Sequence, residues 1–175
     1  LDREDPDSYP FPNRGERWKS FHNDFRQACL DNQTGAVLVT DIASFYDHIA
    51  VDDLVSRASL LLGAGASPAD KAVIEFLGAL LRQCTLSGYG LPQNLDPSSF
   101  FASMYLSAVD REIVDKRYRY FRWVDDIRIC ARNKKQALRA LHDLQAALGR
   151  HRQFLASDKT RIFEKGTKEF DELLD

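Results

Sequence analysis

The sequence predicts an α+β fold in which helices pack on one face of a small antiparallel sheet. Short runs rich in β-branched and aromatic residues lie at 36–42, 119–130 and 154–163. The run at 119–130 divides into two strands around a central turn, as in an antiparallel hairpin. Longer stretches with apolar residues at helical spacing separate these runs.

The composition is that of one soluble globular domain. The chain has 175 residues, of which 44% are hydrophobic and 29% charged, and its formal net charge is -2. This charge counts mildly against a nucleic-acid binder, although local patches matter more than the sum. No apolar run approaches the roughly 18 residues that span a membrane, and no signal peptide opens the chain, so we expect no membrane partner.

The cysteines and the chain ends carry two further expectations. The three cysteines, Cys29, Cys84 and Cys130, are odd in number and far apart, which is typical of reduced thiols in a cytoplasmic protein. The chain starts at Leu1 instead of methionine and stops after "FDELLD", so we interpret it as an excised domain.

The elements expected in the first half follow from local signals. Residues 1–17 are rich in Pro, Asp, Asn and Arg and predict an irregular lead-in, which a helix over 18–30 follows. The apolar run 36–42 predicts a buried strand, and 51–62 has helical spacing. "GAGAS" ends that helix, and Ser67, with Pro68 next and Asp70 three residues on, starts another that runs to about Cys84.

The second half repeats this logic. "SGYGLPQN" is a loop, and Pro97 takes a first helical position in a helix that runs to about Val114. Two strands follow around residues 125–126. Asn133 caps a further helix before the last strand, and its apolar face is expected to hold Ala137, Leu138, Leu141, Leu144 and Leu148.

Two adjacent aspartates, Asp125 and Asp126, interrupt the strand-like run "RYFRWVDDIRIC". Like charges about 4 Å apart repel by roughly 1 kcal/mol in water, and by more in a protein. Asp41 closes the buried strand "VLVTD" and makes a third acid if the strands are neighbours. Divalent metals with oxygen ligands would neutralise such a cluster. The alternative is a solvated hairpin tip, where Asp-Asp pairs are common.

Four segments resemble motifs A, B, C and D of reverse transcriptases, in that order: "VTDIASFYDHI", "GLPQNLDPSSFFASMYLSAVD", "YFRWVDDIRI" and "LASDKTRIF". The resemblance implies a polymerase palm with a ferredoxin-like core over 36–165. Residues 1–35 are then a lead-in with a possible remnant of the fingers, and 166–175 start a truncated C-terminal region. It also implies an RNA-directed DNA polymerase, most similar to bacterial abortive-infection and phage-defence enzymes, with retron and group II intron enzymes as neighbours.

The resemblance also implies site residues. Asp41, Asp125, Asp126 and the backbone carbonyl of Ile42 would hold Mg²⁺, or Mn²⁺. Lys159 would protonate the pyrophosphate leaving group; the alternative is an exposed lysine on a turn.

The resemblance also implies a set of residues that bind the incoming dNTP. The amides of Ala43, Ser44 and Phe45 would face the triphosphate. Tyr46 would exclude a 2′-hydroxyl, unless it is a core tyrosine. Gln93 would contact nucleotide and template, unless it is a solvated loop residue.

Three departures from the family pattern limit what is carried over. Trp123 replaces the usual Tyr or Phe of motif C, Asn94 replaces the glycine of motif B, and the fingers and thumb are barely represented. An RNA or DNA template and primer are the expected partners, together with the missing fingers and thumb or a partner chain, and this fragment alone should bind duplex weakly. The alternatives are template-independent or protein-primed DNA synthesis, and a non-catalytic palm that serves assembly or nucleic-acid binding.

Overall fold

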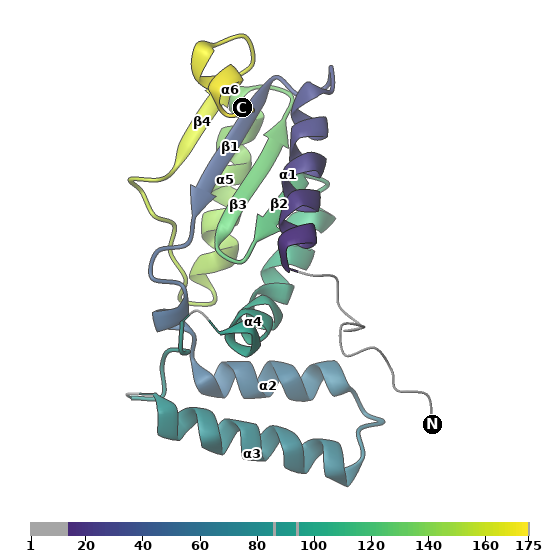
Figure 1. Ribbon diagram of the computed structural model, residues 1–175, viewed down its shortest axis with the longest axis vertical. Helices are drawn as coiled ribbons and strands as arrows, with labels where there is room; N and C mark the ends of the chain where they lie inside the picture. The colour runs from purple at the N-terminus through teal and green to yellow at the C-terminus, as the bar shows by residue number, and fades with distance from the viewer. Residues whose placement is uncertain (1–13, 86, 94, 175) are drawn as a thin grey trace.

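The computed structural model describes residues 14–85, 87–93 and 95–174 (Figure 1). The elements in chain order are α1 (Arg14–Leu30), β1 (Ala36–Asp41), the 3₁₀ turn η1 (Tyr46–His48), α2 (Val51–Leu62), α3 (Pro68–Cys84), α4 (Asp96–Asp115), β2 (Arg119–Trp123), β3 (Asp126–Ala131), α5 (Lys134–Gly149), β4 (Arg161–Glu164) and α6 (Lys168–Glu172). The predicted α+β class and the predicted order from β1 to β4 are confirmed.

The four strands form one antiparallel sheet in the order β2-β3-β1-β4. The two central strands, β1 and β3, are far apart in sequence and pair from Ala36 with Ala131 to Asp41 with Asp126. β2 and β3 form the expected hairpin, and β4 adds to the free edge of β1. This strand order is that of the ferredoxin-like split βαβ arrangement, so the expected core topology is present.

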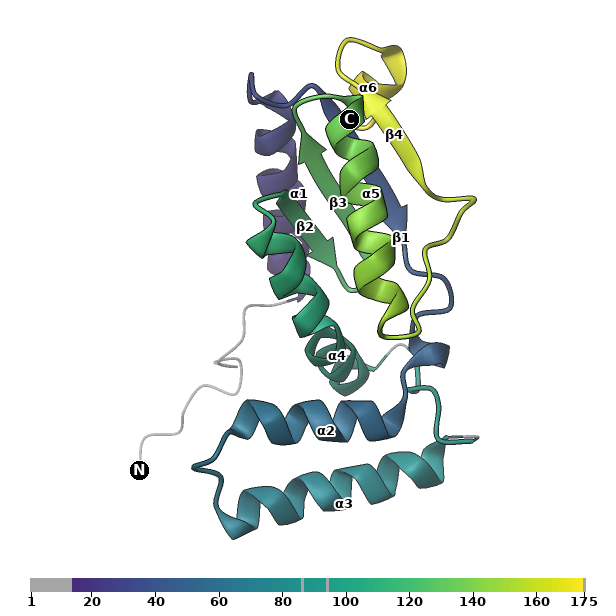
Figure 2. The ribbon, with the colours of Figure 1, turned by 180° about the vertical axis from the view of Figure 1, so that it is seen from behind.

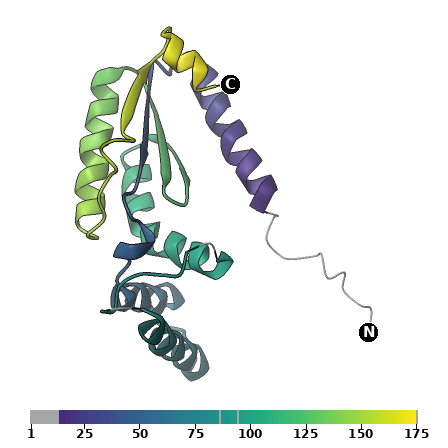
Figure 3. The same ribbon diagram turned by 60° about the vertical axis from the view of Figure 1, so that its left-hand side comes forward.

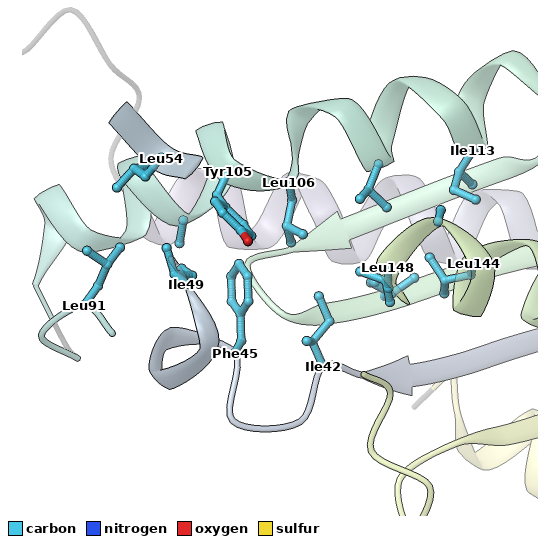
Figure 4. Close-up of a cluster of buried hydrophobic side chains, with 14 of the residues drawn as sticks. Ile42, Phe45, Ile49, Leu54, Leu91, Tyr105, Leu106, Ile113, Leu144 and Leu148 are labelled. Atoms are coloured by element: carbon cyan, nitrogen blue, oxygen red, sulfur yellow. The ribbon is translucent and has the colours of Figure 1, made fainter. Parts of the chain in front are cut away.

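One face of the sheet carries the main hydrophobic core, which α4 and α5 cover (Figure 2). Leu38 of β1 and Ile127 and Ile129 of β3 point to this face and are fully buried. Figure 4 shows part of this core, in which Leu106 and Ile113 come from α4 and Leu144 and Leu148 from α5. The same cluster continues past the end of β1 through the residues Ile42, Phe45, Ile49 and Tyr105.

Helix α1 packs against the opposite face of the sheet (Figure 3). Phe25 and Cys29 of α1 are buried there against Val37 of β1 and Cys130 of β3, with Phe170 of α6. The sheet is therefore covered on both faces over part of its length, whereas the sequence predicted helices on one face. The sequence did not place α1, because the face of the sheet that a helix covers is decided by tertiary packing.

Helices α2 and α3 form an antiparallel pair beside the sheet layer (Figure 1). The predicted start of α3 is a complete capping box, in which Ser67 and Asp70 each accept a hydrogen bond from the other's backbone amide. Gly63 ends α2 at φ 71°, a left-handed conformation that glycine adopts at low cost. "GAGAS" is thus the helix terminator that the sequence predicts.

Three local expectations need correction. Helix α1 begins at Arg14, so 14–17 are helical, while 1–13 of the predicted lead-in lie outside the described residues. Leu138 is half exposed, and Ala140 takes its place on the buried face of α5 because that face follows 137, 140, 144 and 147–148. The last strand starts only at Arg161; before it, Leu155 forms an isolated bridge with Ile42.

No helix among the described residues has the length and apolar character needed to cross a membrane.

Gly35 allows us to test the pairing of β1 with β3. Its amide donates to the Ala131 carbonyl (2.9 Å), and a Cβ there would lie 2.3 Å from the Arg132 carbonyl oxygen. Backbone cannot yield as a side chain does, so Gly35→Ala should lower the free energy of unfolding by about 1–3 kcal/mol or more. Gly65→Ala is the matched control because nothing lies within 4 Å of its Cβ position, and it should stay within about 0.5 kcal/mol. Equal denaturant midpoints for the two variants would contradict this register.

Candidate active site

The predicted acids meet at the end of the two central strands. Asp41 is the last residue of β1 and lies opposite Asp126, the first residue of β3. Asp125 occupies the turn between β2 and β3, and its carbonyl accepts a hydrogen bond from the Ile42 amide (3.2 Å). The hairpin turn is thereby tied to the chain as it leaves β1, since Ile42 and Asp125 are 83 residues apart in the sequence.

Asp41 and Asp125 form a close carboxylate pair. Partial burial raises the pKa of Asp125, and the negative charge and hydrogen bonding of Asp41 raise it further, while Lys159 opposes this shift. Two carboxylates in contact resist carrying two charges at once. Such a pair suits a cation that neutralises both groups.

Lys159 already supplies positive charge to this pair. Its ammonium forms an ion pair with Asp41, and that contact is the main reason that the pKa of Lys159 is raised. The loop that carries Lys159 is fixed to the end of β1, since the Ala156 amide donates to the Asp41 carbonyl (2.8 Å) and the hydroxyls of Thr40 and Thr160 lie 2.7 Å apart. The lysine is exposed, but it is directed at the acids.

Asp126 is held differently. Arg128, two residues along β3, contacts both of its carboxylate oxygens, the closer at 2.8 Å. The Arg128 guanidinium lies over the rings of Phe21 (5.0 Å) and Phe25 (4.8 Å) of α1. Asp126 is therefore paired with a nearly buried cation on the α1 face of the sheet.

The expected cluster of three carboxylates is accordingly reduced to two. Within residues 14–85, 87–93 and 95–174, no group of three His, Cys, Asp or Glu side chains has a geometry that could hold a metal ion. Two of the three acids have basic partners, because Lys159 pairs with Asp41 and Arg128 pairs with Asp126. Asp41 and Asp125 remain suited to a hard divalent ion, which takes one or two carboxylates and completes its shell with substrate phosphates and water.

The Asp126–Arg128 pair could have been predicted from the sequence. Residues two apart on a strand share a face, so an arginine at that spacing was a candidate partner. The alternation of β3 thus predicts the Asp126–Arg128 pair as well as the buried face, although the expectations above use it only for the buried face. The aromatic residues of α1 over Arg128 could not be found in this way, because their contact depends on tertiary packing.

The segment after β1 meets the expected nucleotide contacts only in part. The Ala43 amide donates to the Phe154 carbonyl (2.8 Å). It is therefore not free to bind the triphosphate, contrary to the expectation. Ser44 has φ 46°, and Phe45 is buried in the core. Tyr46 is partly buried, and its hydroxyl lies 3.1 Å from that of Ser99 on α4.

Gln93 lies exposed in the loop before α4. Its amide nitrogen donates to Asp47 (3.3 Å), which ties this loop to η1 close to Tyr46. Asn94, the departure from the motif B pattern, lies outside the described residues. Trp123, at the end of β2, packs edge-on against Trp18 of α1 with ring centroids 5.2 Å apart.

A family profile described as "Reverse transcriptase (RNA-dependent DNA polymerase)" matches residues 5–171. The chain belongs to the reverse transcriptase family. Its palm-like α+β fold agrees with the expectation from the four motifs. Among curated proteins, none gives a significant sequence match. The placement among bacterial defence enzymes stays a prediction.

Solved structures of telomerases are similar to this reverse transcriptase domain in fold. Apo telomerase from Candida tropicalis, truncated from the C-terminal domain, matches 90% of the chain with a TM-score of 0.64 at 16% identity. Telomerase from Candida albicans, in complex with a fragment of telomeric RNA, matches 93% with a TM-score of 0.60 at 14% identity. The chain spans only 36% and 32% of these two proteins, so the likeness concerns the fold of this region.

The raised pKa of Asp125 predicts that Asp125→Asn stabilises the fold at neutral pH. Below the ordinary carboxyl pKa of about 4 the wild-type group is protonated in both states and costs nothing. As the pH rises through that value towards the raised folded-state pKa, the wild type loses stability and the asparagine variant does not. The advantage of the variant should therefore grow as the pH rises from below the ordinary carboxyl pKa to above the raised folded-state pKa, and then level off.

Thermal melts across this pH range measure the effect, and each kcal/mol corresponds to about 2–4 °C for a domain of this size. Asp115→Asn, at an exposed carboxylate at the end of α4, is the control and should show no such pH-dependent gain. A variant less stable than wild type at pH 7 would mean that Asp125 is stabilised by its surroundings.

Proposed function

We propose that this domain is the palm of an RNA-directed DNA polymerase that adds dNMP to a nucleic-acid 3′ end. The observation that carries the proposal is the Asp41–Asp125 carboxylate pair, at the end of the central strands of a reverse transcriptase domain, with Lys159 directed at it. These are the motif A, C and D positions, brought together from three distant parts of the chain.

In this proposal, Asp41, Asp125 and the carbonyl of Ile42 would hold Mg²⁺ or Mn²⁺, and Asp126 would join them only if its pair with Arg128 opens. When bound, two such ions stabilise the attacking 3′ oxygen and the leaving phosphate oxygens. Asp41 and Asp125 bind and orient, and the ring of Tyr46 excludes a ribose 2′-hydroxyl. The backbone amides of Ser44 and Phe45 and the side chain of Gln93 lie beside this position and contribute to binding the dNTP.

Lys159 has a defined proton role in this scheme. Its raised pKa keeps the ammonium protonated while it is paired with Asp41. With a metal ion bound, Asp41 would be a ligand and Lys159 would lose this partner and the cause of its raised pKa. Lys159 would then be free to give its proton to the pyrophosphate leaving group.

One observation favours a non-catalytic palm as the second candidate. Both Asp41 and Asp126 already have basic partners, so the acids can persist without metal. Template-independent or protein-primed synthesis, as in phage defence, would use the same acids. Cys29 and Cys130 lie side by side as free thiols, with their Sγ atoms 3.8 Å apart, and a reducing, cytoplasmic setting for this domain is part of the proposal.

Primer extension by the intact protein tests the proposal. An RNA template with a DNA primer, a DNA template and no template are compared, each with dNTPs or NTPs and with Mg²⁺ or Mn²⁺. We expect templated dNTP addition that Asp125→Asn lowers on the order of 10²–10³-fold, because charge stabilisation in the transition state is lost. Asp115→Asn should extend like wild type.

The other outcomes separate the candidates. Equal extension without template would favour template-independent synthesis. No extension under any condition, with Asp125→Asn indistinguishable from wild type, would leave the non-catalytic palm as the function.

Tyr46 should set the choice of sugar, and Ser99 should hold its ring. Tyr46→Ala is expected to lower the dNTP-over-NTP preference by about tenfold or more because steric exclusion is lost. Ser99→Ala removes only the hydrogen bond to the Tyr46 hydroxyl, so it should lower the preference less. Ser107→Ala, two turns further along α4, is the control. Selectivity unchanged in Tyr46→Ala would identify Tyr46 as a core residue.

A further inference from the structure

An ion pair between α4 and β2 lies directly behind the Asp125 turn. Arg122 of β2 binds both carboxylate oxygens of Asp110 on α4, at 2.8 Å through Nε and 2.5 Å through Nη2. The Tyr120 hydroxyl also donates to this carboxylate, at 2.8 Å. The Arg122 side chain is only 10% exposed. A bidentate pair of this kind fixes the plane and direction of the guanidinium.

The fixed guanidinium has one more donor, and the backbone of the turn accepts it. Nη1 of Arg122 donates to the Val124 carbonyl at 2.8 Å. Val124 has φ 56°, a left-handed conformation that is unfavourable for a β-branched residue. Such conformations persist where the surroundings hold them. Arg122 thus donates to the carbonyl of the residue with this conformation, Val124, and Asp125 is the next residue along the chain.

The other side of the turn is held by β1, because the Asp125 carbonyl accepts the Ile42 amide. We propose that Arg122, oriented by Asp110, is a positioning residue that holds the Val124–Asp125 turn so that the Asp125 carboxylate meets Asp41. The bonds from Arg122 to Asp110 are sufficient to join β2 to α4. The additional bond from Arg122 to the Val124 carbonyl acts on the turn itself. The inference rests on the proposed function in that Asp125 is taken as a metal ligand.

Arg122→Lys is the sharpest variant. Lysine keeps the charge that Asp110 needs, but one ammonium cannot reproduce the planar fork and also reach the Val124 carbonyl. Tyr118→Phe is the matched control. The Tyr118 hydroxyl donates to Asp143 of α5 at 2.8 Å, just before β2 begins. Tyr118→Phe therefore also removes a hydrogen bond to a helix carboxylate, but at the end of β2 that is away from the turn.

Three readouts on the intact protein separate positioning from plain stability. Mn²⁺ affinity from water-proton relaxation should fall about tenfold or more in Arg122→Lys, the usual effect of losing a group that orients a ligand. Hydrogen exchange at the Ile42 amide should be about tenfold faster, because its acceptor is the Asp125 carbonyl. Extension should show lower kcat with unchanged primer KM. Tyr118→Phe should match wild type in all three.

Wild-type Mn²⁺ affinity and Ile42 exchange in Arg122→Lys would overturn the inference. Equal changes in Tyr118→Phe would also overturn it, since the effect would then be general destabilisation. Asp125→Asn identifies a failure of the proposed function: if it leaves Mn²⁺ binding unchanged, the metal role of Asp125 fails. Ile42 exchange still decides whether Arg122 holds the turn in that case.

Discussion

The pairing of β1 with β3 is the constraint on which the rest of this structure depends. Six residue pairs run from Ala36 with Ala131 to Asp41 with Asp126, and the interior side chains of both strands are buried. A shift by one residue would turn Asp41 and Asp126 to opposite faces and expose the core side chains. The apolar interior thus fixes where the acids lie. The Lys159 loop and the Asp125 turn are then attached to the same strand end by backbone hydrogen bonds.

Charge at this strand end is balanced from two directions. Lys159 reaches Asp41 from an exposed loop, while Arg128 reaches Asp126 from beneath the aromatic rings of α1. An exposed lysine is released easily, because water replaces its partner. A nearly buried arginine is not, since separating it leaves an unpaired charge. The two acids of β1 and β3 therefore differ in how readily they exchange their partner for another cation.

Local signals in the sequence were sufficient for most of the fold. The caps at Ser67 and Asn133 and the alternation around Asp125 each act within a few residues, and the structure has the predicted elements there. The four motifs are local signals as well, since each spans a short segment, and they indicated the acids and Lys159. The placement of α1, the packing of its Phe21 and Phe25 rings over Arg128 and the use of the Ala43 amide by Phe154 depend on segments brought together by folding. No spacing along the chain encodes those contacts.

The long separation of the two central strands has a consequence for biosynthesis. β1 emerges from the ribosome with buried-type side chains, but its partner β3 follows only after the three helices α2, α3 and α4. At roughly 5–20 residues per second, the intervening chain takes several seconds or more to make. During that time the nascent chain carries an unpaired apolar strand, which is a site for aggregation or chaperone binding. Of the helices made in the interval, α4 shares the main core with Leu38 of β1, whereas α5, which packs on β1, is made only after β3.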